Sequence, residues 1–148
     1  MSLWAWALEA YAQEGVAQAC LALQDDHGQN VPLLLWAVWA EGADAETLAR
    51  GASLAAALDE RAIKPLRAAR RGLKPALAGV DDRAREALRE DVKAVELQAE
   101  RLLLDALEGL CGPRAGGLPA LAALQAASRA WGVSASDEAL ARLAGALS

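Results

Sequence analysis

The sequence predicts an all-α fold, and three observations lead to this prediction. Alanine and leucine dominate the 148 residues, whereas phenylalanine is absent, and this composition favours helices because such side chains lose little rotamer freedom there. Apolar residues recur at intervals of three and four along most of the chain, which is the period of an amphipathic helix. Residues that cap helices, such as Asn30, Asp44 and Ser136, stand before several of these stretches. We expect seven or eight helices.

Length and composition predict that these helices form one compact bundle. A chain of this length removes about 70% of its unfolded surface from water when it folds, and 55% of the residues are hydrophobic. Disordered chains need the opposite, a low hydrophobicity with a high net charge. Because no repeat of fixed period occurs, we expect an irregular bundle rather than a solenoid. The prediction is a single helical domain that comprises residues 1–148.

The first two predicted helices each end at a glycine. Gly15 is placed to end the first helix and Gly28 to close the second in a left-handed conformation. One apolar face of the first helix is formed by Leu3, Trp4, Ala7, Leu8 and Tyr11. The same spacing in the second helix aligns Val16, Ala19, Cys20 and Leu23. Both helices are therefore expected to pack through one face.

The third predicted helix is apolar around almost its whole circumference. Asn30 caps it, Pro32 lies in its first turn, where no amide donor is needed, and Gly42 ends it. Its apolar residues are Leu33, Leu34, Leu35, Trp36, Val38 and Trp39. A helix without a polar face is normally surrounded by neighbours. We therefore place this helix in the core.

Asp44 is the expected cap of a fourth helix, which Pro65 should interrupt or kink. The proline ring clashes with the carbonyl four residues earlier in a regular helix. The pair Lys74-Pro75 and Gly79 mark the next break. Apolar and mostly small residues form the buried stripe before Pro65, namely Leu48, Ala52, Ala55, Leu58 and Ala62.

Asp81 begins the longest predicted helix, which continues to about Leu110. We expect one apolar face along its whole length, formed by Leu88, Val92, Val95, Ala99, Leu102, Leu103, Ala106, Leu107 and Leu110. A short linker follows, marked by Gly109, Gly112, Pro113, Gly116 and Gly117. Two further helices are then expected, one from Pro119 to Trp131 and one that Ser136 caps.

The charge and the apolar runs disfavour two classes of partner. A net charge of −5 and a pI near 4.9 mean that the molecule as a whole repels phosphate and anionic lipid. Bases need aromatic rings to stack on, yet none occurs between Trp39 and Trp131, which disfavours nucleic acid. The longest apolar run, residues 31–40, is too short to span a membrane, and residues 1–11 lack the pattern of a secretory signal. We expect a cytoplasmic protein without a membrane contact.

The best functional candidate in the sequence is a basic stripe. Lys64, Arg67, Arg71 and Lys74 recur at helical spacing, and Arg61 and Arg70 widen the stripe. Such a helix can bind an acidic protein surface or a phosphate group. It can also pair within the fold with the acidic residues of the helix that begins at Asp81. The sequence leaves these possibilities open, and the binding residues it nominates are Lys64, Arg67, Arg70, Arg71 and Lys74.

A second candidate is a small-molecule-binding protein or enzyme with a pocket around the two core tryptophans. Trp36 and Trp39 would line it, and Asp25, Asp26, His27 or Glu41 would form its polar edge. Three consecutive side chains diverge and cannot all face one ion, so we expect no metal site at Asp25–His27.

The sequence favours a non-catalytic role, because the residue sets of known reactions are missing from it. It contains no GxSxG elbow and no glycine-rich phosphate loop, and we expect neither a cofactor nor a catalytic residue. Cys20 and Cys111 have no CxxC spacing and are interpreted as small buried hydrophobic residues, with a disulfide as the alternative.

Three segments carry a resemblance to a known family. They read LWAWALEAY, GVAQACLALQDDHGQNVPLLLWAVWAEG and IKPLRAARRGLK and correspond to residues 3–11, 15–42 and 63–74. Together they resemble a family of small uncharacterised bacterial proteins with a domain of unknown function. The resemblance covers most of the chain and is firmest before Lys74. It implies a bacterial, cytosolic protein of one domain and assigns no activity or binding residue.

The core position of Trp36 can be tested by substitution. We expect Trp36→Ala to lower the free energy of unfolding by about 3 to 5 kcal/mol, through lost burial and the cavity that remains. Chemical denaturation of the two proteins measures this difference. A loss below about 1 kcal/mol would place the side chain at the surface.

Overall fold

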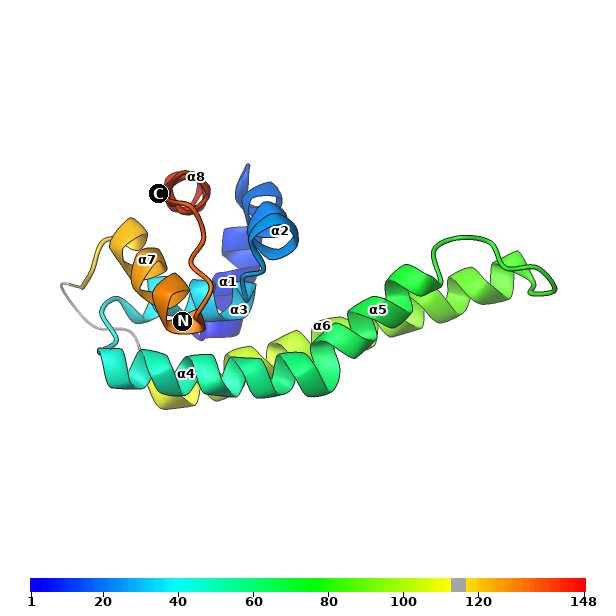
Figure 1. Cartoon of the computed structure of the whole chain (residues 1–148), viewed down its shortest axis with the longest axis horizontal. Helices are drawn as coiled ribbons and strands as arrows, with labels where there is room; N and C mark the ends of the chain where they lie inside the picture. Colours follow the sequence, from blue (N-terminus) through cyan, green and yellow to red (C-terminus); the bar gives the residue numbers. More distant parts are fainter. Residues whose placement is uncertain (113–116) are drawn as a thin grey trace.

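The computed structural model describes residues 1–112 and 117–148, and among these residues all regular elements are helices. Eight α-helices and one π-helical segment follow each other along the chain (Figure 1). Their bounds are α1 Leu3–Ala12, α2 Val16–His27, α3 Val31–Ala40, α4 Ala45–Leu58, η1 Asp59–Ile63, α5 Lys64–Gly72, α6 Asp82–Leu110, α7 Ala120–Trp131 and α8 Asp137–Ala146. The predicted all-α class is confirmed.

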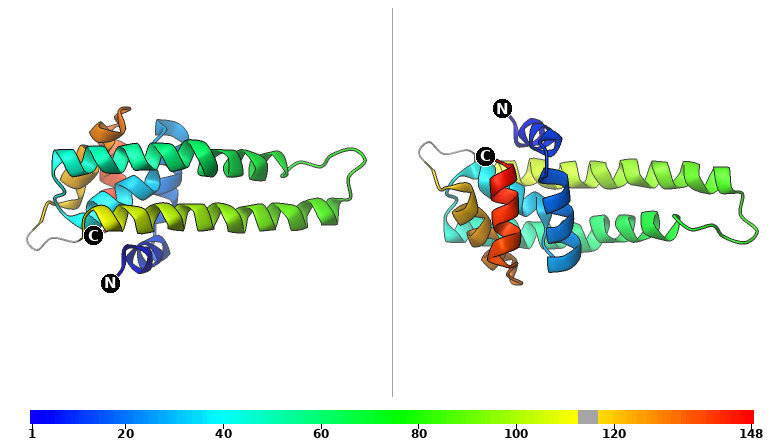
Figure 2. Two further views of the ribbon diagram at one scale, coloured as in Figure 1. Left: turned by 90° about the horizontal axis from the view of Figure 1, so that it is seen from below. Right: turned by 90° about the horizontal axis from the view of Figure 1, so that it is seen from above.

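Two long antiparallel rods form one side of the molecule. One rod is the continuous run α4–η1–α5 and the other is α6, as both views in Figure 2 show. The helices α1, α2, α3, α7 and α8 lie together against one end of these rods (Figure 1). At the other end, α5 and the first half of α6 extend beyond the other helices. We call this projecting helical hairpin, residues 64–95, the arm.

Local sequence signals set most helix ends. The side chains of Asn30, Asp44, Asp81 and Ser136 each accept a hydrogen bond from the backbone N–H three residues later. Gly28 follows α2 with a left-handed φ of +61°, a conformation that glycine adopts without steric cost. The predicted caps Gly28, Asn30, Asp44 and Ser136 are confirmed. The prediction that Gly15 ends the first helix is wrong, because α1 ends at Ala12 and Gly15 directly precedes α2. Of the predicted linker, Gly109 still belongs to α6, and Pro113 and Gly116 lie outside the described residues.

The helix α3 is the centre of the core, as predicted. It contacts α1, α2, α4, α6 and α7, and Trp36 is fully buried. The Trp36 indole Nε1 donates a hydrogen bond to the backbone carbonyl of Cys111 at 3.1 Å. Gly51 of α4 faces the ring so closely that a Cβ atom there would lie 2.4 Å from Cζ3 of Trp36. The glycine therefore permits the approach of α4 to α3.

Pro65 interrupts the α-helical geometry without ending the helix. The five residues before Lys64 form the π-helical segment η1, in which the N–H of Lys64 donates to the carbonyl of Asp59, five residues earlier. The wider turn makes room where the ring of Pro65 would otherwise meet the carbonyl of Arg61. The rod α4–η1–α5 thus stays helical through the predicted break.

The prediction of one apolar face along all of α6 is wrong for the arm. Leu88 and Val95 are about half exposed, whereas Arg85 is buried. The pattern also fails just beyond the arm, where Leu102 is exposed and Glu96 is buried. Of the described helices, α5 faces the first half of α6, and the inner side of α5 carries Arg67 and Arg70. The face follows the predicted apolar pattern only where α6 enters the core, at Leu103 and Leu107.

The contact between Gly51 and Trp36 gives a prediction for stability. We expect Gly51→Ala to lower the free energy of unfolding by about 1 to 3 kcal/mol, because the added methyl group overpacks the core. Gly109→Ala is the matched control, since that helical glycine has open space at its Cβ position. Urea denaturation should show a loss for the first variant and no loss for the second. Equal stabilities of the two variants would contradict the close approach.

Candidate functional site

The basic helix α5 directs two of its arginines toward α6. Arg70 donates through Nε to the carboxylate of Glu96, and Arg67 Nε lies 3.5 Å from the other oxygen of the same group. Glu96 is buried, with 6% of its surface exposed. A carboxylate removed from water in this way requires paired cations. Arg67 and Arg70 therefore hold the two helices of the arm together.

The other nominated cations lie on the outer side of α5. Lys64 Nζ is 3.5 Å from Asp59, and its side chain is 67% exposed. Arg71 Nη2 is 3.0 Å from Asp25 at the end of α2, and its side chain is 54% exposed. The structure thus brings Asp25 into an ion pair with the basic stripe.

The end of the basic stripe is held by a buried arginine that sequence reasoning missed. Nη1 of Arg85 donates to the backbone carbonyls of Leu73 and Lys74, at 2.6 and 2.9 Å. These carbonyls lie just after α5, where helices leave acceptors without partners and where positive charge is favourable. Lys74 is exposed. Lys64, Arg71 and Lys74 form the accessible part of the stripe, and we call them the outer cations.

The nominated pocket residues lie in different environments. Trp36 and Trp39 are packed in the core, with 0% and 8% exposure. Asp25 and Asp26 are exposed on the last turn of α2, beside the partly buried His27. Glu41 is exposed just after α3, with a left-handed φ of +47°. Within the described residues, no group of three or more His, Cys, Asp or Glu side chains is arranged to hold a metal ion.

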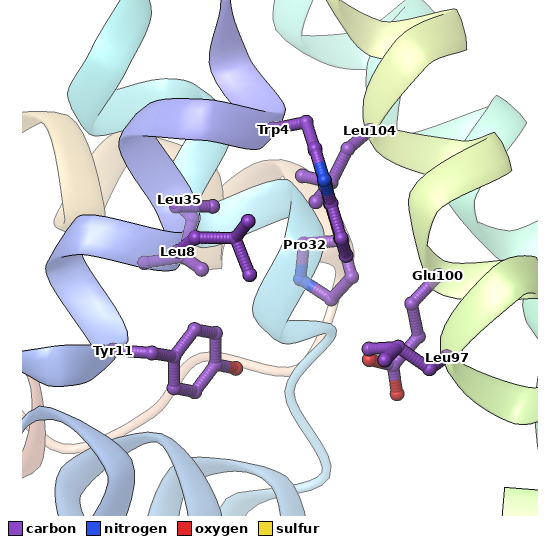
Figure 3. A pocket seen from close by; sticks show the side chains of 9 residues that line it. Trp4, Leu8, Tyr11, Pro32, Leu35, Leu97, Glu100 and Leu104 are labelled. Atoms are coloured by element: carbon purple, nitrogen blue, oxygen red, sulfur yellow. The ribbon is translucent and has the colours of Figure 1, made fainter. Parts of the chain in front are cut away.

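A groove that the sequence did not nominate separates α1 from α6. Figure 3 shows Trp4, Leu8 and Tyr11 of α1 on one side and Leu97, Glu100 and Leu104 of α6 on the other. Pro32 and Leu35 of α3 and Ala7 of α1 complete the lining. Its cavity has a volume of about 50 Å³. We call this feature the α1–α6 groove.

The rim of this groove combines exposed apolar groups with one carboxylate. Leu8 and Leu97 are each 51% exposed, although leucine is normally buried in a protein of this size. The guanidinium of Arg101 lies 5.1 Å from the centre of the Trp4 ring, a cation–π contact that fixes the ring at the edge. The sequence placed Trp4, Leu8 and Tyr11 on one face of a helix. The sequence did not indicate which residues of this face would stay exposed after α6 packs against the helix.

Glu100 is the groove residue whose pKa shift bears on ligand binding. Burial raises the pKa of Glu100, and the negative charge of Glu96 adds to this effect. Arg67 and Arg70 act in the opposite direction but do not overcome it. Among the described residues, Glu100 has no hydrogen bond or ion pair. The groove therefore contains a partly desolvated carboxylate that Arg67 and Arg70 compensate only in part and with which no described residue forms an ion pair.

The cysteines offer no nucleophile. Both are free and buried, which confirms their interpretation as buried hydrophobic residues and excludes the disulfide. Burial raises the pKa of the Cys20 thiol to about 11. At neutral pH, Cys20 is therefore a thiol rather than the reactive thiolate.

Comparison with known proteins gives one match. A family model described as a protein of unknown function (DUF2390) matches residues 2–107. The comparisons with curated proteins and with solved structures found no match. None of the helices in the described residues is both long enough and apolar enough to cross a membrane.

Because the pKa of Glu100 is raised, we expect the Glu100→Gln substitution to change the stability of the protein in a pH-dependent way. The folded protein takes up a proton on Glu100 at a higher pH than the unfolded chain, so ionisation of Glu100 costs stability above its folded pKa. We expect Glu100→Gln to be more stable than the parent protein at neutral pH. This advantage should shrink as the pH falls through the folded pKa toward the ordinary value of 4.5.

Urea denaturation over a series of pH values measures this difference in stability. Glu90→Gln removes the same charge from an exposed position of α6 and serves as the control. A Glu100→Gln variant that is less stable than the parent at neutral pH would show that the carboxylate is stabilised by a partner in the fold.

Proposed function

We propose that this chain, which belongs to the DUF2390 family of proteins of unknown function, is a non-catalytic cytoplasmic protein that binds an acidic surface of another protein through the outer side of α5. One observation carries the proposal. Six of the 15 Lys and Arg residues lie between Arg61 and Lys74, with no Asp or Glu among them, and this segment continues into a projecting arm. A surface of one sign on a projecting element steers and orients a partner of opposite charge.

The outer cations are available to a partner at small cost. Lys64 and Arg71 have internal partners, Asp59 and Asp25, but both cations are more than half exposed. The Arg71–Asp25 pair joins two exposed side chains and contributes about 0.2 to 1 kcal/mol, so an incoming carboxylate can replace Asp25. Asp59 is buried, so Lys64 keeps this partner and offers its remaining N–H groups to an incoming carboxylate. Arg67 and Arg70 play a different part in the proposal. Their pairing with Glu96 keeps α5 in place, so they support the binding surface rather than form it.

The charges around the arm favour an acidic protein over nucleic acid. Asp82 and Glu86 pair with Arg85, which contacts the backbone at the end of α5, and Glu90 follows one turn later in α6. A nucleic acid backbone repeats its charge every few ångströms and would have to pass these carboxylates. A protein presents a limited acidic patch and can match the outer cations alone.

The proposal is tested by reversing the outer cations. We expect the triple variant Lys64→Glu, Arg71→Glu, Lys74→Glu to bind a labelled poly-glutamate peptide about tenfold more weakly, as expected when three exposed pairs are lost. Fluorescence anisotropy at low ionic strength measures this affinity, and the binding should weaken further as salt is added.

A matched control separates the surface from the net charge. The triple variant Arg50→Glu, Arg129→Glu, Arg142→Glu changes the charge by the same amount at exposed positions outside the arm and should bind like the parent protein. Equal losses in both variants, or tighter binding of labelled duplex DNA than of the peptide, would contradict the proposed surface. Proteins captured from lysate of the native host by the parent and not by the arm variant would identify the natural partner.

A further inference from the structure

We propose that the α1–α6 groove is a docking site for a protein segment that presents one aliphatic side chain beside a lysine or arginine. The aliphatic group would fill the cavity between Trp4, Leu8 and Leu97, and the cation would reach Glu100. This site does not use the outer cations of α5 and is independent of their role.

The volume of the cavity indicates how large a group it can hold. A volume of about 50 Å³ exceeds the roughly 10–15 Å³ that one water molecule needs and falls below the roughly 150 Å³ of a cavity that holds benzene. It is far smaller than the roughly 300–1,000 Å³ of pockets for drug-sized ligands. The cavity therefore has room for the end of one aliphatic side chain, with the rest of the ligand outside. This is the arrangement of an anchor residue in a protein interface.

The lining of the cavity explains why an apolar group would enter it. The floor is formed by buried groups, Leu35 and Leu104, and the rim by the half-exposed Leu8 and Leu97. Covering these rim residues removes apolar surface from water, at about 25 cal/mol per Å². Trp4 and Tyr11 add the rigid aromatic walls that are common at binding hot spots (Figure 3).

The carboxylate of Glu100 favours a partner that presents a lysine or arginine at this point. Glu100 lies where the groove meets an open hollow that is also lined by Arg70, Lys93, Glu96 and Leu97. Arg70 is already engaged with Glu96, and Glu100 has no hydrogen bond or ion pair among the described residues. Burial and the charge of Glu96 raise the pKa of Glu100, and Arg67 and Arg70 offset this effect only in part. A lysine or arginine of the partner would complete this compensation, and a partner carboxylate at this point would be repelled.

The probe for the test is a phage-displayed library of random short peptides, panned against the full chain. We expect enriched sequences to contain Leu, Ile or Val at a fixed spacing from Lys or Arg. Synthetic copies of these peptides should shift the indole N–H resonance of Trp4 in NMR spectra. Replacing the aliphatic residue of the peptide by Ala, or its cation by Glu, should abolish or weaken this shift.

Two variants of the chain and one matched control complete the test. Leu97→Asp should abolish peptide binding, and Glu100→Gln should weaken it by about tenfold, as expected for loss of a charge-assisted contact. Leu88→Asp is the control, because Leu88 lies on the same helix and is exposed to 52%, against 51% for Leu97. Circular dichroism confirms that each variant is folded.

Three outcomes would overturn the proposal. The first is no enrichment of any peptide, and the second is enrichment of peptides that bind Leu97→Asp as tightly as the parent. The third is self-association of the parent chain in sedimentation experiments that Leu97→Asp abolishes, which would assign the groove to a second copy. The variant with reversed outer cations should bind the peptides like the parent. The groove and the outer cations are therefore tested independently of each other.

Discussion

The contact of Trp36 with Gly51 is the constraint on which the rest of the structure depends. The largest side chain of the core lies against a position of α4 that has no side chain, and its N–H reaches the carbonyl of Cys111 just after α6. One residue thus connects α3 to both long rods. A packed core tolerates little change in such a contact because its interior is as dense as an organic crystal.

The direction of the arm follows from this arrangement. The rod α4–η1–α5 and α6 are antiparallel beside α3 and continue past it, where no other helix covers them. Beyond the core they meet through the ion pairs of Arg67 and Arg70 with Glu96. Such buried ion pairs add little net stability, but removing one partner is costly because it leaves an uncompensated charge. We infer that the ion pairs of Arg67 and Arg70 with Glu96 fix the register of α5 on α6. In this register the outer cations face solvent.

The two candidate surfaces differ in how they arise. The outer cations are exposed because, among the described helices, only α6 packs along α5 and α2 reaches it through the Asp25–Arg71 ion pair. The charge pattern of the α5 sequence therefore survives in the fold. The α1–α6 groove exists because α1 crosses α6 without covering Leu97 or Glu100 (Figure 3). It is a property of packing between residues almost a hundred positions apart. The first surface was therefore nominated from the sequence, and the second was found only in the structure.

The sequence by itself determined the helices, most of their ends and the central place of α3. These features depend on apolar periodicity and on caps such as Asn30 and Asp44, which act within a few residues. The tertiary structure alone decided that Arg71 meets Asp25, 46 positions away, that α6 is charged on its inner face within the arm, and that no described residue makes a hydrogen bond or ion pair with Glu100. These outcomes depend on which helices become neighbours, and a periodic pattern specifies the apolar face of a helix but not the helix that covers it.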